Sequence, residues 1–153
     1  MTINSLSEGL EILHGDTPAA RVKIAIGDEI SLDAVYEAAK PLLTDCELGD
    51  YLCQVIDDIG YTKSEVMEKA SIDDVLGFQI LTGMVHPTFN ALLRICIGAG
   101  FTLDETQNAI ELAGYKRLDE SNKRDEILIR GITYMKPISA LNDLLYEIGD
   151  TLL

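Results

Sequence analysis

Apolar residues recur every three or four positions through most of the chain from Leu48 onward, which is the spacing of one face of an α-helix. The first apolar stripe runs from Leu48 to Ile59 and is followed by Gly60, a residue that commonly ends helices. The last stripe runs from Leu141 to Ile148. The pattern therefore predicts a protein built from short helices.

Two of the predicted helices begin with a capping box. Thr62 and Glu65 have the spacing in which the threonine hydroxyl accepts a backbone N–H while the glutamate carboxylate accepts another. Thr102 and Glu105 repeat this spacing. We therefore expect a helix after Thr62 and another after Thr102.

Other helix boundaries depend on single residues. Ser31, Ser71 and Ser139 are each expected to start a helix, since a serine side chain accepts N–H groups of the first turn. Gly83 is expected to end the helix that Ser71 starts and to have a positive φ. Pro41 interrupts the helix that Ser31 starts, because proline cannot continue a helix interior.

Two segments depart from a purely helical pattern. The stretch RVKIAI, residues 21–26, alternates apolar and polar positions and predicts a strand or extended arm that needs a partner strand. Residues 121–136 fit a helix, although their ILI and ITY triplets also fit a strand. We expect an all-α fold, with an N-terminal arm and helix over 1–43 and a compact helical bundle over 44–153.

The helices predicted over 62–70 and 71–82 have the proportions of a helix-turn-helix. The stretch KSEVMEKASIDDVLGFQILTGMVHPTFNALLRI, residues 63–95, resembles the lambda-repressor-like helix-turn-helix domains of the Xre type. Within it, the triplet ASI resembles the turn of that family, and Gly83 resembles the glycine that closes its recognition helix. The dipeptide PT resembles the start of the helix that follows in the family.

The resemblance continues beyond this motif. The stretches FTLDETQNAIELAGY, NKRDEILIRGI and LNDLLYEIG resemble the C-terminal extension of one uncharacterised bacterial subfamily, so that the resemblance covers residues 45–153. It implies a DNA-binding transcriptional regulator, expected to be a homodimer, with residues 71–82 in the major groove.

The resemblance assigns DNA contacts to the start of this helix and to its next turn. The residues expected to contact DNA are Lys63, Lys69, Asp74, Phe78, Gln79 and Thr82. Glutamine has the geometry to pair with adenine, and aspartate can accept a hydrogen bond from cytosine. Alternatively, Asp73 and Asp74 cap the helix and complement its dipole, and Gln79 is an ordinary solvated residue.

The loop after this helix departs from the family pattern. Related sequences often place polar or basic residues between the glycine and the proline, where they hold phosphate, but this chain has Met84, Val85 and His86. Phe89 stands where related sequences often have an arginine. One interpretation is that Met84, Val85, His86 and Phe89 form an exposed apolar surface that contacts a protein. The other is that Val85 and Phe89 pack into the core.

Charge opposes a role in DNA binding. The chain has 12 Lys and Arg against 26 Asp and Glu, for a net charge of −14. Residues 1–43 carry three basic and seven acidic residues, and residues 44–153 carry nine and nineteen. Neither part has the basic surplus that neutralises phosphates, and the negative field favours basic partners.

The sequence contains no catalytic or metal-ligand pattern. His14 and His86 have no neighbouring nucleophile, no glycine-rich loop follows a strand, and the three cysteines lack metal-ligand spacing. Arg124 and Asp125 suit ion pairing at a helix start. We expect no enzyme activity, cofactor or metal. Without a long apolar run or a basic leader, the chain is expected to be cytoplasmic and free of membrane contact.

Two functions follow from these observations. The first is an Xre-type regulator, in which DNA binding is opposed by charge and by the missing loop cations. The second is an acidic protein-interaction module on the same scaffold, such as an adaptor, an antirepressor or an inhibitor, which binds a protein partner and not DNA.

Overall fold

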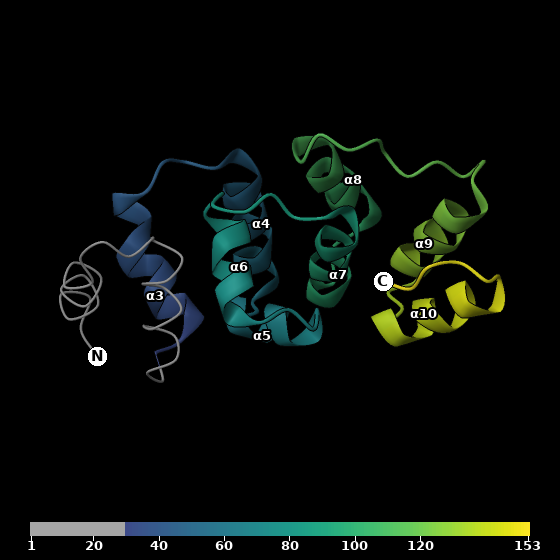
Figure 1. Ribbon diagram of the computed structural model, residues 1–153, viewed down its shortest axis with the longest axis horizontal. Coiled ribbons are helices and arrows are strands. Elements are labelled where there is room, and N and C mark those ends of the chain that lie inside the picture. The colour runs from purple at the N-terminus through teal and green to yellow at the C-terminus, as the bar shows by residue number, and fades with distance from the viewer. Residues whose placement is uncertain (1–29) are drawn as a thin grey trace.

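The computed structural model describes residues 30–153, and within this range the chain forms helices and no strand. Figure 1 shows the helices in succession from α3 at one end of the molecule to α9 and α10 at the other. The elements are α3 (Leu32–Ala39), the 3-10 helix η1 (Lys40–Leu42), α4 (Glu47–Ile59), α5 (Lys63–Lys69), α6 (Asp74–Leu81), α7 (Phe89–Ala99), α8 (Leu103–Leu112), α9 (Lys123–Thr133) and α10 (Ile138–Glu147). The all-α class is confirmed for the described residues, and the stretch RVKIAI lies outside them.

The predicted capping boxes are present at both sites. The Thr62 hydroxyl accepts the N–H of Glu65 at 3.1 Å, and the Glu65 carboxylate accepts the N–H of Thr62 at 3.2 Å. The corresponding distances between Thr102 and Glu105 are 3.2 and 2.9 Å. These boxes satisfy N–H groups that would otherwise lack partners in the first turns of α5 and α8.

Two predicted helix starts were wrong. Ser71 has a φ of 56° and lies in the turn after α5, and Asp73 caps α6 by accepting the N–H of Leu76 at 2.9 Å. Helix α10 begins at Ile138, one residue before Ser139, with Pro137 at the N-cap position and no side-chain cap. The residues before each helix determine where it begins: Ser71 with its positive φ precedes α6, and Pro137 precedes α10.

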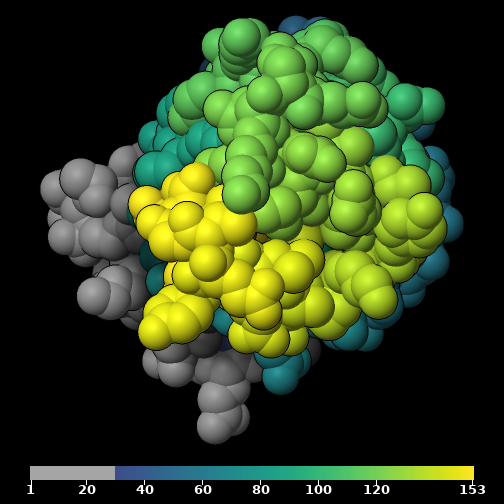
Figure 2. Space-filling model, turned by 90° about the vertical axis from the view of Figure 1, so that its right-hand side faces the viewer, coloured from purple at the N-terminus to yellow at the C-terminus, as the bar shows by residue number. Residues whose placement is uncertain are grey.

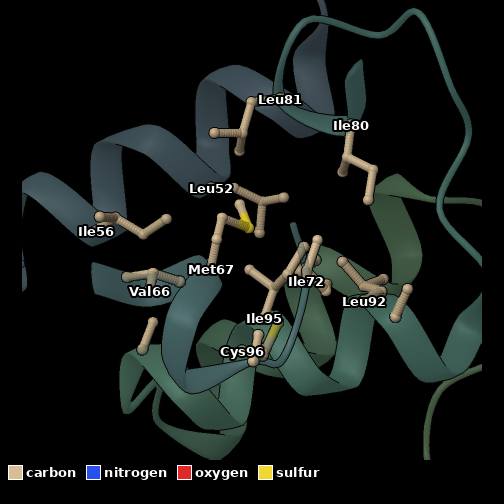
Figure 3. Packing of buried hydrophobic residues seen from close by; sticks show 14 of the residues in the cluster. Leu52, Ile56, Val66, Met67, Ile72, Ile80, Leu81, Leu92, Ile95 and Cys96 are labelled. Carbon is tan, nitrogen blue, oxygen red and sulfur yellow. The ribbon is translucent and has the colours of Figure 1, made fainter. Parts of the chain in front are cut away.

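A single hydrophobic core joins helices from α3 to α10. In Figure 3, side chains from α4, α5, α6 and α7 point into the same interior. The labelled residues are Leu52, Ile56, Val66, Met67, Ile72, Ile80, Leu81, Leu92, Ile95 and Cys96. Burial of this many apolar side chains is the main favourable term for the fold.

Helix α3 belongs to this core. Leu32 and Val35 are buried in it, and α3 contacts α5 and α6. The Asp33 carboxylate accepts the N–H of Lys63 at 2.8 Å and that of Ser64 at 3.4 Å, so α3 caps the start of α5. The predicted boundary between residues 43 and 44 therefore does not separate two cores within the described range, and the role of residues 1–29 stays a prediction.

The C-terminal segment is tied to the rest of the molecule by Arg124. Its guanidinium donates to Asp150 Oδ1 at 3.2 Å, to Asn90 Oδ1 at 3.2 Å and to the carbonyl of Thr151. These bonds join α9, α7 and the chain end, and Figure 2 shows the C-terminal residues packed against the neighbouring segment of α9. The expectation that Arg124 serves an ion pair is confirmed.

Helices α4 and α6 approach closely because residue 49 is glycine. A Cβ atom added at Gly49 would lie 1.9 Å from the carbonyl oxygen of Leu81 and 2.7 Å from its carbonyl carbon. A side chain at position 49 would therefore require α4 or α6 to move. Between α9 and α10 the close contact at glycine is with a side chain: a Cβ at Gly131 would lie 1.9 Å from Leu141 Cδ2.

We predict that Gly49→Ala lowers the free energy of unfolding by about 1–3 kcal/mol, the usual cost of forcing extra atoms into a packed contact. The matched control is Gln54→Ala on the exposed side of α4, which should change stability by no more than about 0.5 kcal/mol. Urea unfolding of the three proteins measures both effects. Equal stability of Gly49→Ala and wild type would contradict the α4–α6 packing described above.

Candidate functional site

The first candidate site is the pair α5 and α6 with the turn between them. The two helices are joined by residues 70–73, in which Ser71 has a φ of 56° and Ile72 is buried. This connection keeps the two helices in contact through Met67, which packs against Gly77. The pair consists of two short helices joined by a turn, each shorter than the sequence predicts.

Helix α6 is mostly a core helix. Phe78 and Leu81 are fully buried, and the Thr82 hydroxyl is buried while it donates to the carbonyl of Phe78 at 2.7 Å. The expected DNA contacts by Phe78 and Thr82 do not fit this fold, because Phe78 has no exposed surface and Thr82 is only 6% exposed with its hydroxyl bonded to backbone. Gln79 is half-buried and lies on the exposed edge of α6 together with Val75.

The two lysines expected at the DNA surface have different surroundings. Lys63 is only 4% exposed; its ammonium lies 3.7 Å from the Asp57 carboxylate and 4.7 Å from the ring centroid of Tyr36. It is held between α3 and α4 and cannot reach a phosphate without leaving these partners. Lys69 is exposed at the end of α5, where its ammonium lies 5.3 Å from the ring centroid of Tyr61.

Carboxylates converge where α5 and α6 begin. Asp33 caps α5, Asp73 caps α6, and Asp74 accepts a hydrogen bond from the Ser64 hydroxyl at 3.4 Å. Burial raises the pKa of Asp74, and repulsion from Asp33 and Asp73 raises it further. The capping interpretation of Asp73 is confirmed. This end of α6 presents negative charge where a DNA-reading helix would meet phosphates.

The loop after α6 is held in place by Tyr115. The Tyr115 hydroxyl donates to the carbonyl of Pro87 at 2.8 Å, and its ring lies 5.4 Å from that of Phe89 and 5.6 Å from that of His86. Phe89 and Met84 are half-buried against the core.

Three of the four residues expected to form an exposed apolar surface, Met84, Val85 and Phe89, are half-buried. The N–H of Val85 donates to the carbonyl of Gln79 at 3.1 Å. Of the four residues, His86 alone is exposed. Phe89 packs against the core, as the second interpretation of the sequence expects.

A buried polar cluster lies between α3 and α4. Burial raises the pKa of Tyr36 well above its ordinary value, and the neighbouring Cys53 thiol adds to the shift. Burial also raises the pKa of Cys53, so this thiol stays protonated and is a poor nucleophile. Within residues 30–153, no group of His, Cys, Asp or Glu is arranged to hold a metal ion. The cluster therefore has a packing role and no evident chemistry.

The second candidate site is an apolar cleft where α5 and α7 meet the connection between α9 and α10. It has a volume of about 420 Å³, and its wall includes Ile97 and Phe101 from the end of α7. Lys69 and Lys136 are also among its lining residues. The sequence predictions singled out Lys69 for another role and missed the rest of this cleft, because its walls come from segments far apart in the chain.

Comparison with known proteins identifies no relative: no family model matches the sequence, and no curated protein or solved structure has significant similarity to it. No helix among the described residues is long and apolar enough to cross a membrane.

The raised pKa of Tyr36 predicts a loss of stability at alkaline pH. The phenol stays protonated in the folded protein but ionises in the unfolded chain above its ordinary pKa of about 10. The unfolded state then binds fewer protons than the folded state, so stability falls with rising pH by up to about 1.4 kcal/mol per pH unit above pH 10.

The substitution Tyr36→Phe should remove this contribution, so its stability should fall less steeply than that of wild type from pH 9 to 11. Tyr134→Phe is the matched control, because Tyr134 is 70% exposed. Urea unfolding across this pH range is the measurement. Parallel pH profiles for wild type and Tyr36→Phe would show that the folded protein does not hold this phenol protonated.

Proposed function

We propose that this chain is a protein-interaction module on a helix-turn-helix-like scaffold, acting through a protein partner and not by reading DNA. The observation that carries the proposal is the convergence of Asp33, Asp73 and Asp74 at the start of α5 and α6. DNA readers bring cations to this place, because phosphate neutralisation supplies much of their affinity. Here a phosphate would meet three carboxylates.

The burial of α6 supports the same proposal. A recognition helix must project side chains into the major groove, whereas Phe78, Ile80 and Leu81 are buried beneath neighbouring helices. The loop that follows α6 is held by the hydrogen bond from Tyr115 to Pro87, and it contains no Lys or Arg. In the middle of α6, Gln79 is then the one polar side chain available to contact a base.

The alternative function is the DNA-binding regulator implied by the Xre resemblance. The observation that favours it is the short turn over residues 70–73 between α5 and α6, with Lys69 exposed beside it. In that case the resemblance to lambda-repressor-like domains would extend to function, and Lys69 would be the main phosphate contact on α5.

Retention on immobilised mixed genomic DNA distinguishes the two functions. We expect no retention at about 50 mM salt, because even non-specific binding is strongest at low ionic strength and this chain carries a net charge of −14. A basic DNA-binding protein run on the same matrix controls for the capacity of the column. Retention that weakens steeply with salt and is reduced by Lys69→Ala would favour the regulator and contradict the proposal.

A further inference from the structure

The cleft between α5–α7 and the α9–α10 connection reverses the charge of the rest of the chain. The chain has 26 acidic and 12 basic residues, yet the described residues that line this cleft include Lys69 and Lys136 and no carboxylate. Among the described residues, five cations have a carboxylate within 4 Å, whereas Lys69 and Lys136, like Arg94, Lys116 and Lys123, have none. The cleft therefore presents two ammonium groups that have no carboxylate partner among residues 30–153, and that of Lys69 lies over the ring of Tyr61, which also lines the cleft.

The rest of the cleft is apolar and open to solvent. Ile97, Phe101 and Ile132 contribute to its lining, while Ile59 and Met135 remain 41% and 59% exposed. Exposed apolar groups gathered around a cleft are typical of a protein contact. A volume of about 420 Å³ lies within the range of natural ligand pockets, so the cleft can hold a large apolar side chain.

Met135 is an unusual residue for the backbone conformation that ends α9. It follows α9 with a φ of 54°, where glycine is the usual residue, and the chain uses glycine with positive φ after α7 and α8. A side chain in this region costs about 1 kcal/mol relative to glycine. Since the Met135 side chain is also mostly exposed, neither backbone geometry nor burial favours methionine here. A flexible thioether suits a binding surface, because it adapts to the shape of its partner.

We infer that this cleft binds a segment of a partner protein that combines a large apolar anchor side chain with flanking carboxylates. The anchor occupies the apolar lining and contacts Met135, and the carboxylates pair with Lys69 and Lys136. A protein segment fits better than a small acid, because the exposed apolar groups extend past the lining residues to Tyr134, which is 70% exposed. The inference rests on the proposed function and specifies the chemistry of the partner.

Selection of a displayed library of random 12-residue peptides on the full chain tests this inference without knowledge of the partner. We expect the enriched peptides to carry Leu, Phe or Met next to Asp or Glu. The double variant Lys69→Glu/Lys136→Glu should weaken their binding by about tenfold or more, because two attractive pairs become repulsive. The matched control Lys116→Glu/Lys123→Glu changes the same charge at exposed lysines outside the cleft and should change binding by no more than about twofold.

Met135→Gly separates binding from folding. Glycine relieves the positive φ, so this variant should have an unchanged or higher melting temperature, while it binds the selected peptides about fivefold or more weakly. Enrichment of basic or uncharged peptides, no enrichment at all, or equal binding by the cleft variants and wild type would overturn the inference. Retention on DNA is measured independently, so failure of this inference and failure of the proposed function give different results.

Discussion

The close contact between α4 and α6 at Gly49 is the constraint on which the arrangement of the other helices depends. With no side chain at this position, the carbonyl of Leu81 lies where a Cβ atom would otherwise be. This approach places Phe78 and Leu81 in the core and leaves α6 between α3, α4 and α5. Because protein interiors are close-packed, one added methyl group here would displace a helix that three others contact.

The same constraint limits what the surface can do. A helix buried on most of its circumference has few side chains left for recognition: in α6, only Asp74, Val75, Leu76 and Gln79 are half-buried, and the other residues are buried. The start of α6 is negative because Asp73 caps it and Asp74 lies beside it. Exposed apolar groups and unpaired lysines occur together instead at the cleft beyond α7. This cleft lies away from α6, the helix that the family resemblance points to.

Local sequence predicted those features that local chemistry determines. The capping boxes at Thr62 and Thr102 form as predicted, since both partners lie within one helical turn of each other. The positive φ predicted for Gly83 is observed, at 81°. The start of α6 was misplaced because Ser71 belongs to the turn that ends α5. Its positive φ there differs from the extended conformation of an N-cap residue, which Asp73 adopts instead.

Features that depend on distant segments were not predictable in this way. Phe78 and Thr82 were expected at the surface, but they are buried in a core to which α3 and α4 contribute, and these helices lie 19 or more residues earlier in the chain. The run DVLGFQIL, which is apolar on nearly all sides, was a signal of that burial. The cleft joins Lys69 to Lys136 across the fold, and its one local signal was a helix that ends in methionine and not in glycine.

Native-state hydrogen exchange of the α6 amides tests most directly whether α6 is a core helix. The N–H of Thr82 donates to the carbonyl of Phe78 at 3.0 Å, within the part of α6 that packs on α4. If this packing is the central constraint, the amides of Ile80, Leu81 and Thr82 exchange only through global unfolding, with an opening free energy equal to that measured by urea. Opening of these amides at a free energy lower by about 2 kcal/mol or more would show that α6 detaches locally, and would contradict the account.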